Sequence, residues 1–416
     1  MRIRNDQYAL FLSSPMADAD RELYCGVAIN SQASFSSPLR FGGPMTAGIA
    51  RTFALFLFAA ANPGTAIATD ESGSGAASPP LIPCGSLSAR PWAARADGTK
   101  VRLCLPPTSR NYSPRNSGIG FTALDIESEA CFVPDSAYRT MDEIIDAVRV
   151  RLDARIQPAP DVSISERARA IGQVTGDVLA EMGFALYVPT EMMGDMLVPR
   201  SEAEEKPRYV TDCDTSSLVL LTVAEALGAR ASLVEINLPT GEGHNFVRWQ
   251  VGGGRVLDWD MNARAECSAP TDSPGFQGMA MTSEQTMSYL LSLRAEKHLQ
   301  SGDILKALAD NREAIRKFPG HPRAYNNFCW TVATAEFDER AAMLAEAIGY
   351  SKKLLSIHRV PATIDTAACL AAYAGDFTAA VELVEEALQA QPGDLVLESR
   401  LAGFKSLPPR DCTGAN

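Results

Sequence analysis

Residues Val210–Gly228 read VTDCDTSSLVLLTVAEALG, and this stretch decides what kind of core the chain builds. Asp and Thr at its start are residues that cap helix N-termini, and the final glycine is typical of a helix C-terminus. Leu220, Val223 and Leu227 recur at helical spacing, and further apolar residues occupy most of the other faces. A helix that is apolar nearly all round lies inside a protein, so the sequence predicts a buried helix here.

Strands are predicted directly after this helix. Residues Ala231–Leu238, Asn245–Val251 and Arg255–Asp260 are short segments with strand-forming residues, and Gly252-Gly253-Gly254 joins the last two as a hairpin turn. The order of elements is therefore helix, strand, hairpin. We expect an α+β core in which the buried helix packs on an antiparallel sheet.

One cysteine and one histidine in this region have the arrangement of a nucleophile and its base. Cys213 stands at the N-terminus of the predicted helix, where unpaired N–H groups and the helix dipole favour a thiolate. The same N–H groups would help to hold the oxyanion of a tetrahedral intermediate. Of the four histidines, three lie in the C-terminal helices, which leaves His244 as the base. Asp212 and Asp214 oppose thiolate formation, so His244 has to offset them as a cation.

A third group is needed to orient the imidazole, and three residues around the last strand are candidates. Asp258, Asp260 and Asn262 share one face, because side chains alternate along a strand with a period of two. Simple pairing across the glycine turn matches residue 251 with 255, which puts Asn262 opposite His244 and Asp260 one diagonal step away. Register alone leaves this choice open.

These residues occur in three short motifs, whose order and spacing resemble those of the transglutaminase-like superfamily. The core of that superfamily is a papain-type cysteine-protease fold, and the resemblance extends over about residues 139–395. The superfamily includes protein cross-linkers, peptidases, amidases and members that have lost activity, so the motifs indicate the fold more than the reaction. The motifs are Asp212–Ser217 (DCDTSS), Gly243–Trp249 (GHNFVRW) and Leu257–Asp260 (LDWD).

The resemblance also implies a role for each candidate residue. Cys213 would be the nucleophile, His244 the base and Asp260 the orienting acid. Asp260 is favoured over Asp258 because it directly follows Trp259, as the acid of the family follows a tryptophan.

The C-terminal part contains an internal repeat. Gly302–Gly320 (GDILKALADNREAIRKFPG) recurs 73 residues later as Gly375–Gly393 (GDFTAAVELVEEALQAQPG), with small residues and a final Pro-Gly in common. This pattern resembles the tetratricopeptide repeat, a helix pair of about 34 residues in which small residues let the helices approach closely. His321–Glu336 would supply the first helix of a middle unit. The alanines that match between the copies are Ala307, Ala314, Ala380 and Ala387.

We therefore expect an all-α repeat domain over residues 286–400 and a tail at 401–416. Residues 136–285 hold the transglutaminase-like motifs, with two more helices predicted at Met141–Leu152 and Ser165–Met182. Residues 69–135 begin as a flexible linker and continue as a loop-rich extension with little periodicity. Bacterial transglutaminase-like proteins with C-terminal tetratricopeptide repeats are the closest resemblance to this arrangement.

The N-terminal region carries an export signal if translation starts at Met45. A positively charged segment is followed by the apolar run Phe53–Ala61 (FALFLFAAA) and by a small-x-small cleavage site at Ala66–Ala68. We expect residues 1–68 to be an upstream extension and signal peptide, with the mature chain beginning near Thr69. The mature protein is then expected to be periplasmic or secreted.

Composition narrows the partners and cofactors. A net charge of −12 without a basic run argues against nucleic acid, and the longest apolar tract is shorter than the roughly 20 residues that span a bilayer. The nine cysteines include no CxxC pair and the histidines are not clustered, so no metal or cofactor is expected. Cys84 and Cys104 bracket a short loop and either form a disulfide or stay free and buried. Cys412, near the chain end, is expected to be an exposed thiol.

Together these features predict an exported cysteine enzyme that forms an acyl-enzyme intermediate on peptide or protein amide bonds. Hydrolysis and transfer to an amine are both compatible with a triad of Cys213, His244 and Asp260. The alternative is a catalytically inactive scaffold that binds a peptide or protein through its helical repeats.

The export hypothesis can be tested on protein recovered from the native cell envelope. N-terminal sequencing is expected to begin near Thr69, because Ala66–Ala68 is the motif at which the signal would be cut. Recovery of the chain only from cytoplasm, still carrying the residues before Thr69, would contradict the hypothesis.

Overall fold

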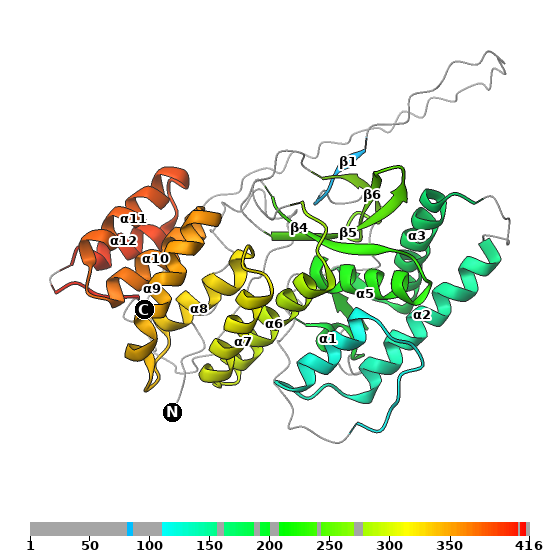
Figure 1. The fold of residues 1–416 in the computed structure, drawn as a ribbon, viewed down its shortest axis with the longest axis horizontal. Coiled ribbons are helices and arrows are strands. Elements are labelled where there is room, and N and C mark those ends of the chain that lie inside the picture. Colours follow the sequence, from blue (N-terminus) through cyan, green and yellow to red (C-terminus); the bar gives the residue numbers. More distant parts are fainter. Residues whose placement is uncertain are drawn as a thin grey trace, which may run out of the picture. The chain divides into compact units, whose positions relative to one another are not determined.

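The computed structural model describes residues 81–85, 110–155, 162–186, 192–199, 208–238, 243–269, 278–406 and 408–412. Within these residues, a core of helices and a five-stranded sheet is followed by a run of helices (Figure 1). The predicted export signal at residues 1–68 lies outside the described residues.

The main sheet is formed by strands from both ends of the core. Its strands are β1 (Ile82–Pro83), β4 (Ala231–Asn237), β5 (Gly243–Gly252), β6 (Arg255–Asp260) and β7 (Ala265–Ser268). They lie in the order β1-β7-β6-β5-β4, with β1 parallel to β7 and all other pairs antiparallel. The predicted antiparallel sheet is thus present, enlarged by β7 and β1, which the sequence analysis did not find.

The hairpin between β5 and β6 has the predicted register from Val247 to Gln250, but it shifts next to the turn, where Gly252 and not Val251 pairs with Arg255. Val247 pairs with Trp259 and Trp249 with Leu257, and the turn glycines have positive φ angles of 91°, 60° and 72°. This register would place Asn262 opposite His244, but the β5–β6 pairing stops at Val247 and Trp259. Beyond that point β5 pairs only with β4 and β6 only with β7, so the β5–β6 register does not decide which residue meets His244.

The buried helix is α5 (Cys213–Ala226), and every residue from Thr215 to Ala224 is buried. Its N-terminus has a capping box: Asp212 accepts the backbone N–H of Thr215 at 2.8 Å, and the Thr215 hydroxyl accepts the Asp212 N–H at 3.1 Å. Ser217 donates its hydroxyl to the carbonyl of Asn245 on β5 at 3.1 Å. Figure 1 shows α5 beneath the sheet, as the apolar sequence predicts.

The region before α5 is more regular than predicted. The loop-rich assignment of residues 69–135 is wrong for β1 and for the first helix, α1, because both depend on distant partners. The α1 N–H groups of Ile119 and Gly120 are bound, both at 2.7 Å, by Glu225 and Thr222 of α5, 106 and 102 residues away. The elements here are α1 (Ile119–Ser128), α2 (Asp135–Arg155), α3 (Ile164–Met182), β2 (Phe184–Leu186), α4 (Met193–Leu197) and β3 (Tyr209–Thr211), of which β2 and β3 pair in parallel.

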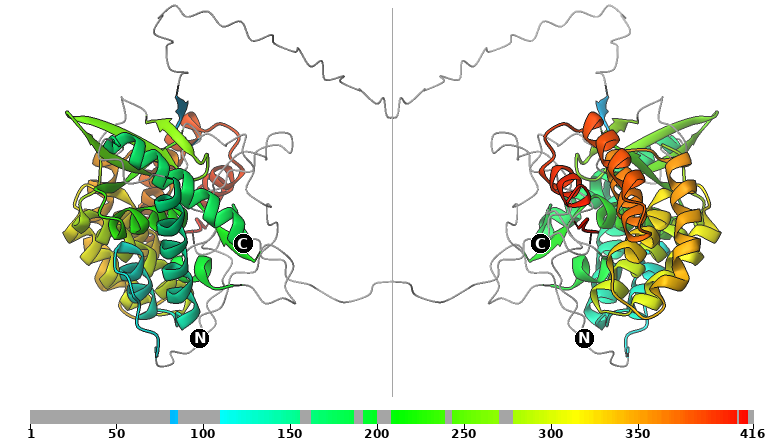
Figure 2. Two further views of the ribbon diagram at one scale, coloured as in Figure 1. Left: turned by 90° about the vertical axis from the view of Figure 1, so that its right-hand side faces the viewer. Right: turned by 90° about the vertical axis from the view of Figure 1, so that its left-hand side faces the viewer.

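Pairs of helices follow the core, and Figure 2 shows the last of them stacked side by side. The four alanines that match between the sequence repeats are all fully buried, which confirms that they lie where helices touch. This helical region resembles a tetratricopeptide repeat. None of the described helices has the length and apolar composition to cross a bilayer. The pairs are α6 (Ser283–Gln300) with α7 (Ile304–Lys317), α8 (Pro322–Thr334) with α9 (Arg340–Ile357), and α10 (Pro361–Tyr373) with α11 (Phe377–Ala390), followed by α12 (Leu395–Phe404).

Two expectations about cysteines were wrong. Cys84 forms a disulfide with Cys267 and not with Cys104. The two cysteines are 183 residues apart in sequence, but β1 and β7 are neighbours in the sheet. Cys412 is not an exposed thiol, since the tail folds back and Cys412 is bonded to Cys369 of α10. Spacing along the chain does not reveal either disulfide, because in each one the two cysteines are brought together by tertiary contacts.

Replacing Ala380 with Leu is expected to lower the melting temperature, because Ala380 is fully buried in the helical core. Overpacking of this kind typically costs about 1–3 kcal/mol of unfolding free energy. The matched control is Ala390→Leu in the same helix, whose side chain is exposed. Equal melting temperatures for the two variants, measured by calorimetry, would show that Ala380 does not lie at a helix contact.

Candidate active site

Cys213 is the first residue of α5, and its side chain is 5% exposed. Its thiol donates a hydrogen bond to Oδ1 of Asp214, with sulfur and oxygen 3.4 Å apart. The carboxylate of Asp212 is occupied in capping the helix through Thr215. The sulfur thus lies at a helix N-terminus, where the N–H groups and the dipole favour negative charge.

His244, near the start of β5, and Asp260, at the end of β6, meet as a buried pair. Nε2 of His244 is 2.8 Å from Oδ2 of Asp260, and the two side chains are 1% and 0% exposed. Burial by itself lowers the pKa of His244, but the charge and hydrogen bond of Asp260, with a contribution from Asp214, outweigh burial and raise it. Burial raises the pKa of Asp260, and His244 with the neighbouring N–H groups reverses this and lowers it. The imidazolium is therefore kept to higher pH than in an exposed histidine.

Backbone N–H groups satisfy the rest of the Asp260 carboxylate. The Gly85 N–H donates to Oδ2 at 2.7 Å, and the Asn262 and Ala263 N–H groups donate to Oδ1 at 2.8 and 3.4 Å. A fully buried carboxylate requires such donors, because desolvation is otherwise uncompensated. Sequence reasoning missed Gly85, and no local signal points to it.

The side chains of the other two candidates for the orienting residue do not take the place of Asp260 beside His244. Asp258 forms a two-point ion pair with Arg248, with nitrogen–oxygen distances of 2.6 and 2.7 Å. Asn262 reaches Asp260 through its backbone N–H and not through its side chain. The structure therefore brings Asp260 to His244 and leaves Asp258 with another partner.

Asp214 is held by groups that the sequence analysis did not consider. Asn245 donates from Nδ2 to Asp214 Oδ1 at 2.7 Å, and Arg323 of α8 brings Nη2 to within 4.0 Å of Oδ2. The Arg323 guanidinium also lies over the ring of Tyr289, whose hydroxyl accepts from Asn245 at 2.8 Å. Arg323 offsets the charge of Asp214, so His244 is not the sole cation facing that carboxylate.

The C-terminal histidines are closer to the sheet than predicted. His321, at the start of α8, is buried with Nε2 2.7 Å from Oε2 of Glu235 on β4. His358, after α9, has Nε2 2.8 Å from Nδ2 of Asn237 on the same strand. The sequence places both in the helical repeats, and their sequence positions carry no sign of the contact with β4.

The geometry leaves one imidazole nitrogen available for chemistry. Nε2 of His244 is bound by Asp260, whereas Nδ1 is buried and makes no hydrogen bond with the described residues. A buried polar atom of this kind calls for an explanation, and proton transfer is one. Cys213 is connected to this region through Asp214 and Asn245, the residue next to His244. Catalytic hydrogen bonds often tighten only when substrate binds.

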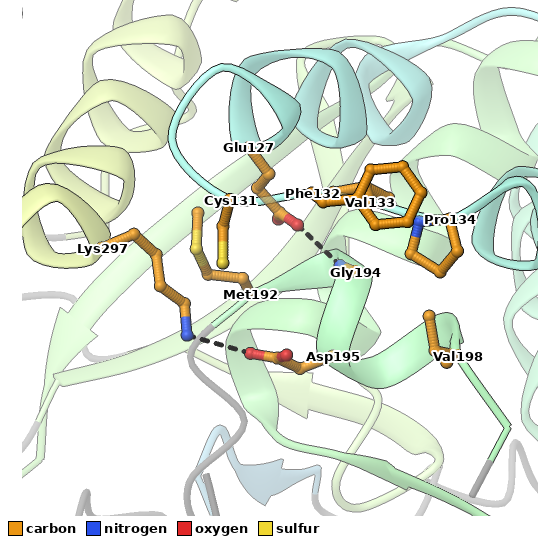
Figure 3. A pocket seen from close by; sticks show the side chains of 10 residues that line it. All are labelled: Glu127, Cys131, Phe132, Val133, Pro134, Met192, Gly194, Asp195, Val198 and Lys297. Carbon is orange, nitrogen blue, oxygen red and sulfur yellow. Dashed lines mark hydrogen bonds and ion pairs between the residues drawn. The ribbon is translucent and has the colours of Figure 1, made fainter. Parts of the chain in front are cut away.

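A separate cavity lies between α1, α4 and α6 and contains none of these residues (Figure 3). Glu127 points its carboxylate at the start of α4 and accepts the N–H groups of Met193 and Gly194 at 2.6 and 2.7 Å. Burial raises the pKa of Glu127 to about 8. Lys297 lies 3.1 Å from Asp195 across the same cavity. These groups are paired with each other and with the α4 backbone, so their arrangement is that of a helix cap.

No cluster of three or more His, Cys, Asp or Glu side chains suited to a metal ion occurs in the described parts of the chain.

Comparisons with known proteins concern the helical repeats. No family model matches the chain, and no curated protein matches it. Several solved structures match part of the chain, and the three named next cover 28–30% of it. They include the first TPR domain of the human RPAP3 protein (14% identity, TM-score 0.26, 29% of this chain and 91% of that one), the N-terminal domain of stress-induced protein-1 from C. elegans (15%, 0.26, 30% and 100%) and a thermophilic TPR protein from Thermus thermophilus (18%, 0.20, 28% and 80%).

Replacing Asp260 with Asn is expected to slow alkylation of Cys213 at pH 7 by about tenfold or more, the effect of one pKa unit or more. In the variant, burial of His244 is no longer outweighed by a carboxylate, so its pKa falls and the imidazolium is lost at lower pH. The measurement is the rate of iodoacetamide labelling against pH.

The matched control is Asn262→Ala, which keeps the backbone N–H that reaches Asp260. A large loss with Asn262→Ala and none with Asp260→Asn would show that simple hairpin register identifies the orienting residue, and that Asp260 does not fill this role.

Proposed function

We propose that this protein is a cysteine acyl-enzyme catalyst of the transglutaminase-like type, acting on amide bonds of peptides or proteins. The observation that carries the proposal is the buried His244–Asp260 pair, whose remaining imidazole nitrogen makes no hydrogen bond with the described residues. Cys213 at the N-terminus of the adjoining buried helix is the nucleophile.

The reaction begins with transfer of the thiol proton to His244, which Asp260 stabilises as imidazolium. The thiolate attacks the amide carbonyl, and N–H groups at the start of α5 bind the developing oxyanion. His244 then gives its proton to the leaving amine, which departs from the thioester. Attack on the thioester by water would make the protein a peptidase or amidase, and attack by a second amine would make it an acyl transferase.

The arrangement of elements supports a papain-type core. A buried helix begins at the thiol, a following strand carries the histidine, and the next strand ends at the acid. Helix, strand and strand follow one another in the same order as Cys213, His244 and Asp260. This is the order of elements expected for a transglutaminase-like site. Export to the periplasm or beyond, and a peptide or protein as substrate, belong to the same proposal.

A non-catalytic scaffold is the second candidate, and one observation favours it. The Cys213 thiol donates its hydrogen to Asp214, and Cys213 and His244 are 5% and 1% exposed. A thiol held by a carboxylate in a closed site is protonated and inert. In that case the helical repeats would bind the peptide or protein partner.

Thiol labelling separates the two functions without a substrate. At pH about 6 an ordinary thiol is almost wholly protonated, whereas a thiolate paired with His244 reacts with iodoacetamide. Cys329 serves as an internal control, because it too is buried and outside any disulfide, and burial raises its pKa. Peptide mass spectrometry is expected to find Cys213 labelled well before Cys329.

The companion variant is His244→Ala, in which preferential labelling of Cys213 is expected to disappear. If Cys213 in the wild type reacts no faster than Cys329, the thiol is not activated and the scaffold is the correct function.

A further inference from the structure

A short segment far upstream of the site in sequence reaches its centre. The N–H of Gly85 donates to Oδ2 of Asp260 at 2.7 Å across 175 residues of sequence, and the same oxygen lies 2.8 Å from Nε2 of His244. This segment, Leu81–Gly85, is called the N-terminal strap below. It bonds to the one carboxylate oxygen that orients the imidazole.

The strap is fastened to the sheet at the residue before Gly85. Cys84 is disulfide-bonded to Cys267 on β7, and its N–H donates to the Ser268 carbonyl at 3.0 Å. The paired part of the strap, β1, is only two residues long. A strand of this length makes too few hydrogen bonds to offset the entropy lost when its backbone is ordered. The disulfide therefore holds Gly85 in place.

Gly85 fits its position closely. Its φ angle is +88°, which L side chains rarely adopt, and a Cβ here would come within 2.3 Å of Cδ2 of Leu238. The same Cβ would be 3.5 Å from Cδ2 of His244, so the strap lies against the imidazole as well as against Asp260. A side chain at this position has to displace the end of Leu238 and strains the backbone at its positive φ, so a substitution disturbs the strap where it bonds to Asp260.

We propose that the N-terminal strap is a positioning part of the catalytic site, which fixes Asp260 for His244 through the Gly85 N–H and depends on the Cys84–Cys267 disulfide. This inference rests on the proposed function. The strap bonds to the orienting acid and is not itself a reacting group, so it acts through Asp260 and His244.

The physical effect follows from the bonds made by Asp260. With the strap in place, both carboxylate oxygens have N–H donors and the pair is closed to water. Without it, Oδ2 loses a donor, water reaches the pair, and the attraction between His244 and Asp260 is screened. The pKa of His244 then falls, and the thiolate–imidazolium pair persists over a narrower pH range.

One consequence is that the proposed enzyme needs some of its cysteines reduced and others oxidised. Cys213 has to be reduced in order to react, while Cys84 and Cys267 have to be oxidised in order to hold the strap. Disulfides persist in oxidising compartments, which is the setting that the proposed export provides.

The test compares two pairs of substitutions that each remove one buried disulfide. Cys84→Ala with Cys267→Ala releases the strap, and Cys369→Ala with Cys412→Ala, the control, opens a disulfide in the helical repeats. The readout is the rate of Cys213 alkylation by iodoacetamide from pH 5 to 9, with melting temperatures measured alongside. We expect release of the strap to slow labelling at pH 7 about tenfold and to move the onset of fast labelling to higher pH by about one unit.

A second comparison keeps both disulfides. Gly85→Ala places a Cβ against Leu238, whereas Gly253→Ala puts the same change on another glycine of positive φ with open space around it. Only Gly85→Ala is expected to shift the pH profile. A merely structural role of the strap would lower the melting temperature and leave the profile of the folded protein unchanged.

The outcomes separate the inference from the proposed function. If wild-type Cys213 reacts faster than Cys329 but the strap variants keep the wild-type pH profile, the inference is wrong and the proposed function stands. If wild-type Cys213 reacts no faster than Cys329, both are wrong.

Discussion

The buried hydrogen bond between His244 and Asp260 is the interaction on which the rest of the candidate site depends. A charged pair with almost no exposure is stable only when the remaining atoms of the carboxylate are bonded as well. The chain meets this requirement with backbone N–H groups from two places, the turn after β6 and Gly85. The second donor comes from the start of the described chain, next to the disulfide that joins Cys84 to Cys267 on β7.

The contact between the helical repeats and the sheet is polar where it approaches the site. Glu235 on β4 is bonded to His321, and Arg323 lies between Glu235 and Asp214 at 3.9 and 4.0 Å. Burial would raise the pKa of Glu235, but the nearby His321 and Arg323 reverse this and lower it. The first turn of α8 therefore belongs to the electrostatic surroundings of Cys213. In the proposed enzyme, the repeats help to set the charge beside the nucleophile in addition to any partner they bind.

The acidic neighbours of Cys213 illustrate how tertiary contacts change the meaning of a local pattern. In sequence, Asp212 and Asp214 both oppose a thiolate, and only His244 stands against them. In the structure, the carboxylate of Asp212 caps the helix. The carboxylate of Asp214 accepts hydrogen bonds from Asn245 and from the Cys213 thiol and lies near the guanidinium of Arg323. The balance between a reactive and an inert thiol is thus set by which partner Asp214 keeps.

The sequence by itself determined the elements whose signals are local. The unbroken apolar run predicted buried α5, three glycines predicted the β5–β6 register, and small residues at repeat spacing predicted the buried Ala307 and Ala380. Only the tertiary structure decided that Asp260 and not Asn262 meets His244, because the strand pairing ends before the register can apply. It also decided the partners of Cys84 and Cys412, and the places of Gly85 and Arg323. Each of these depends on groups from distant parts of the chain, and a buried charge accepts any donor that the fold brings within bonding distance, whatever its position in the sequence.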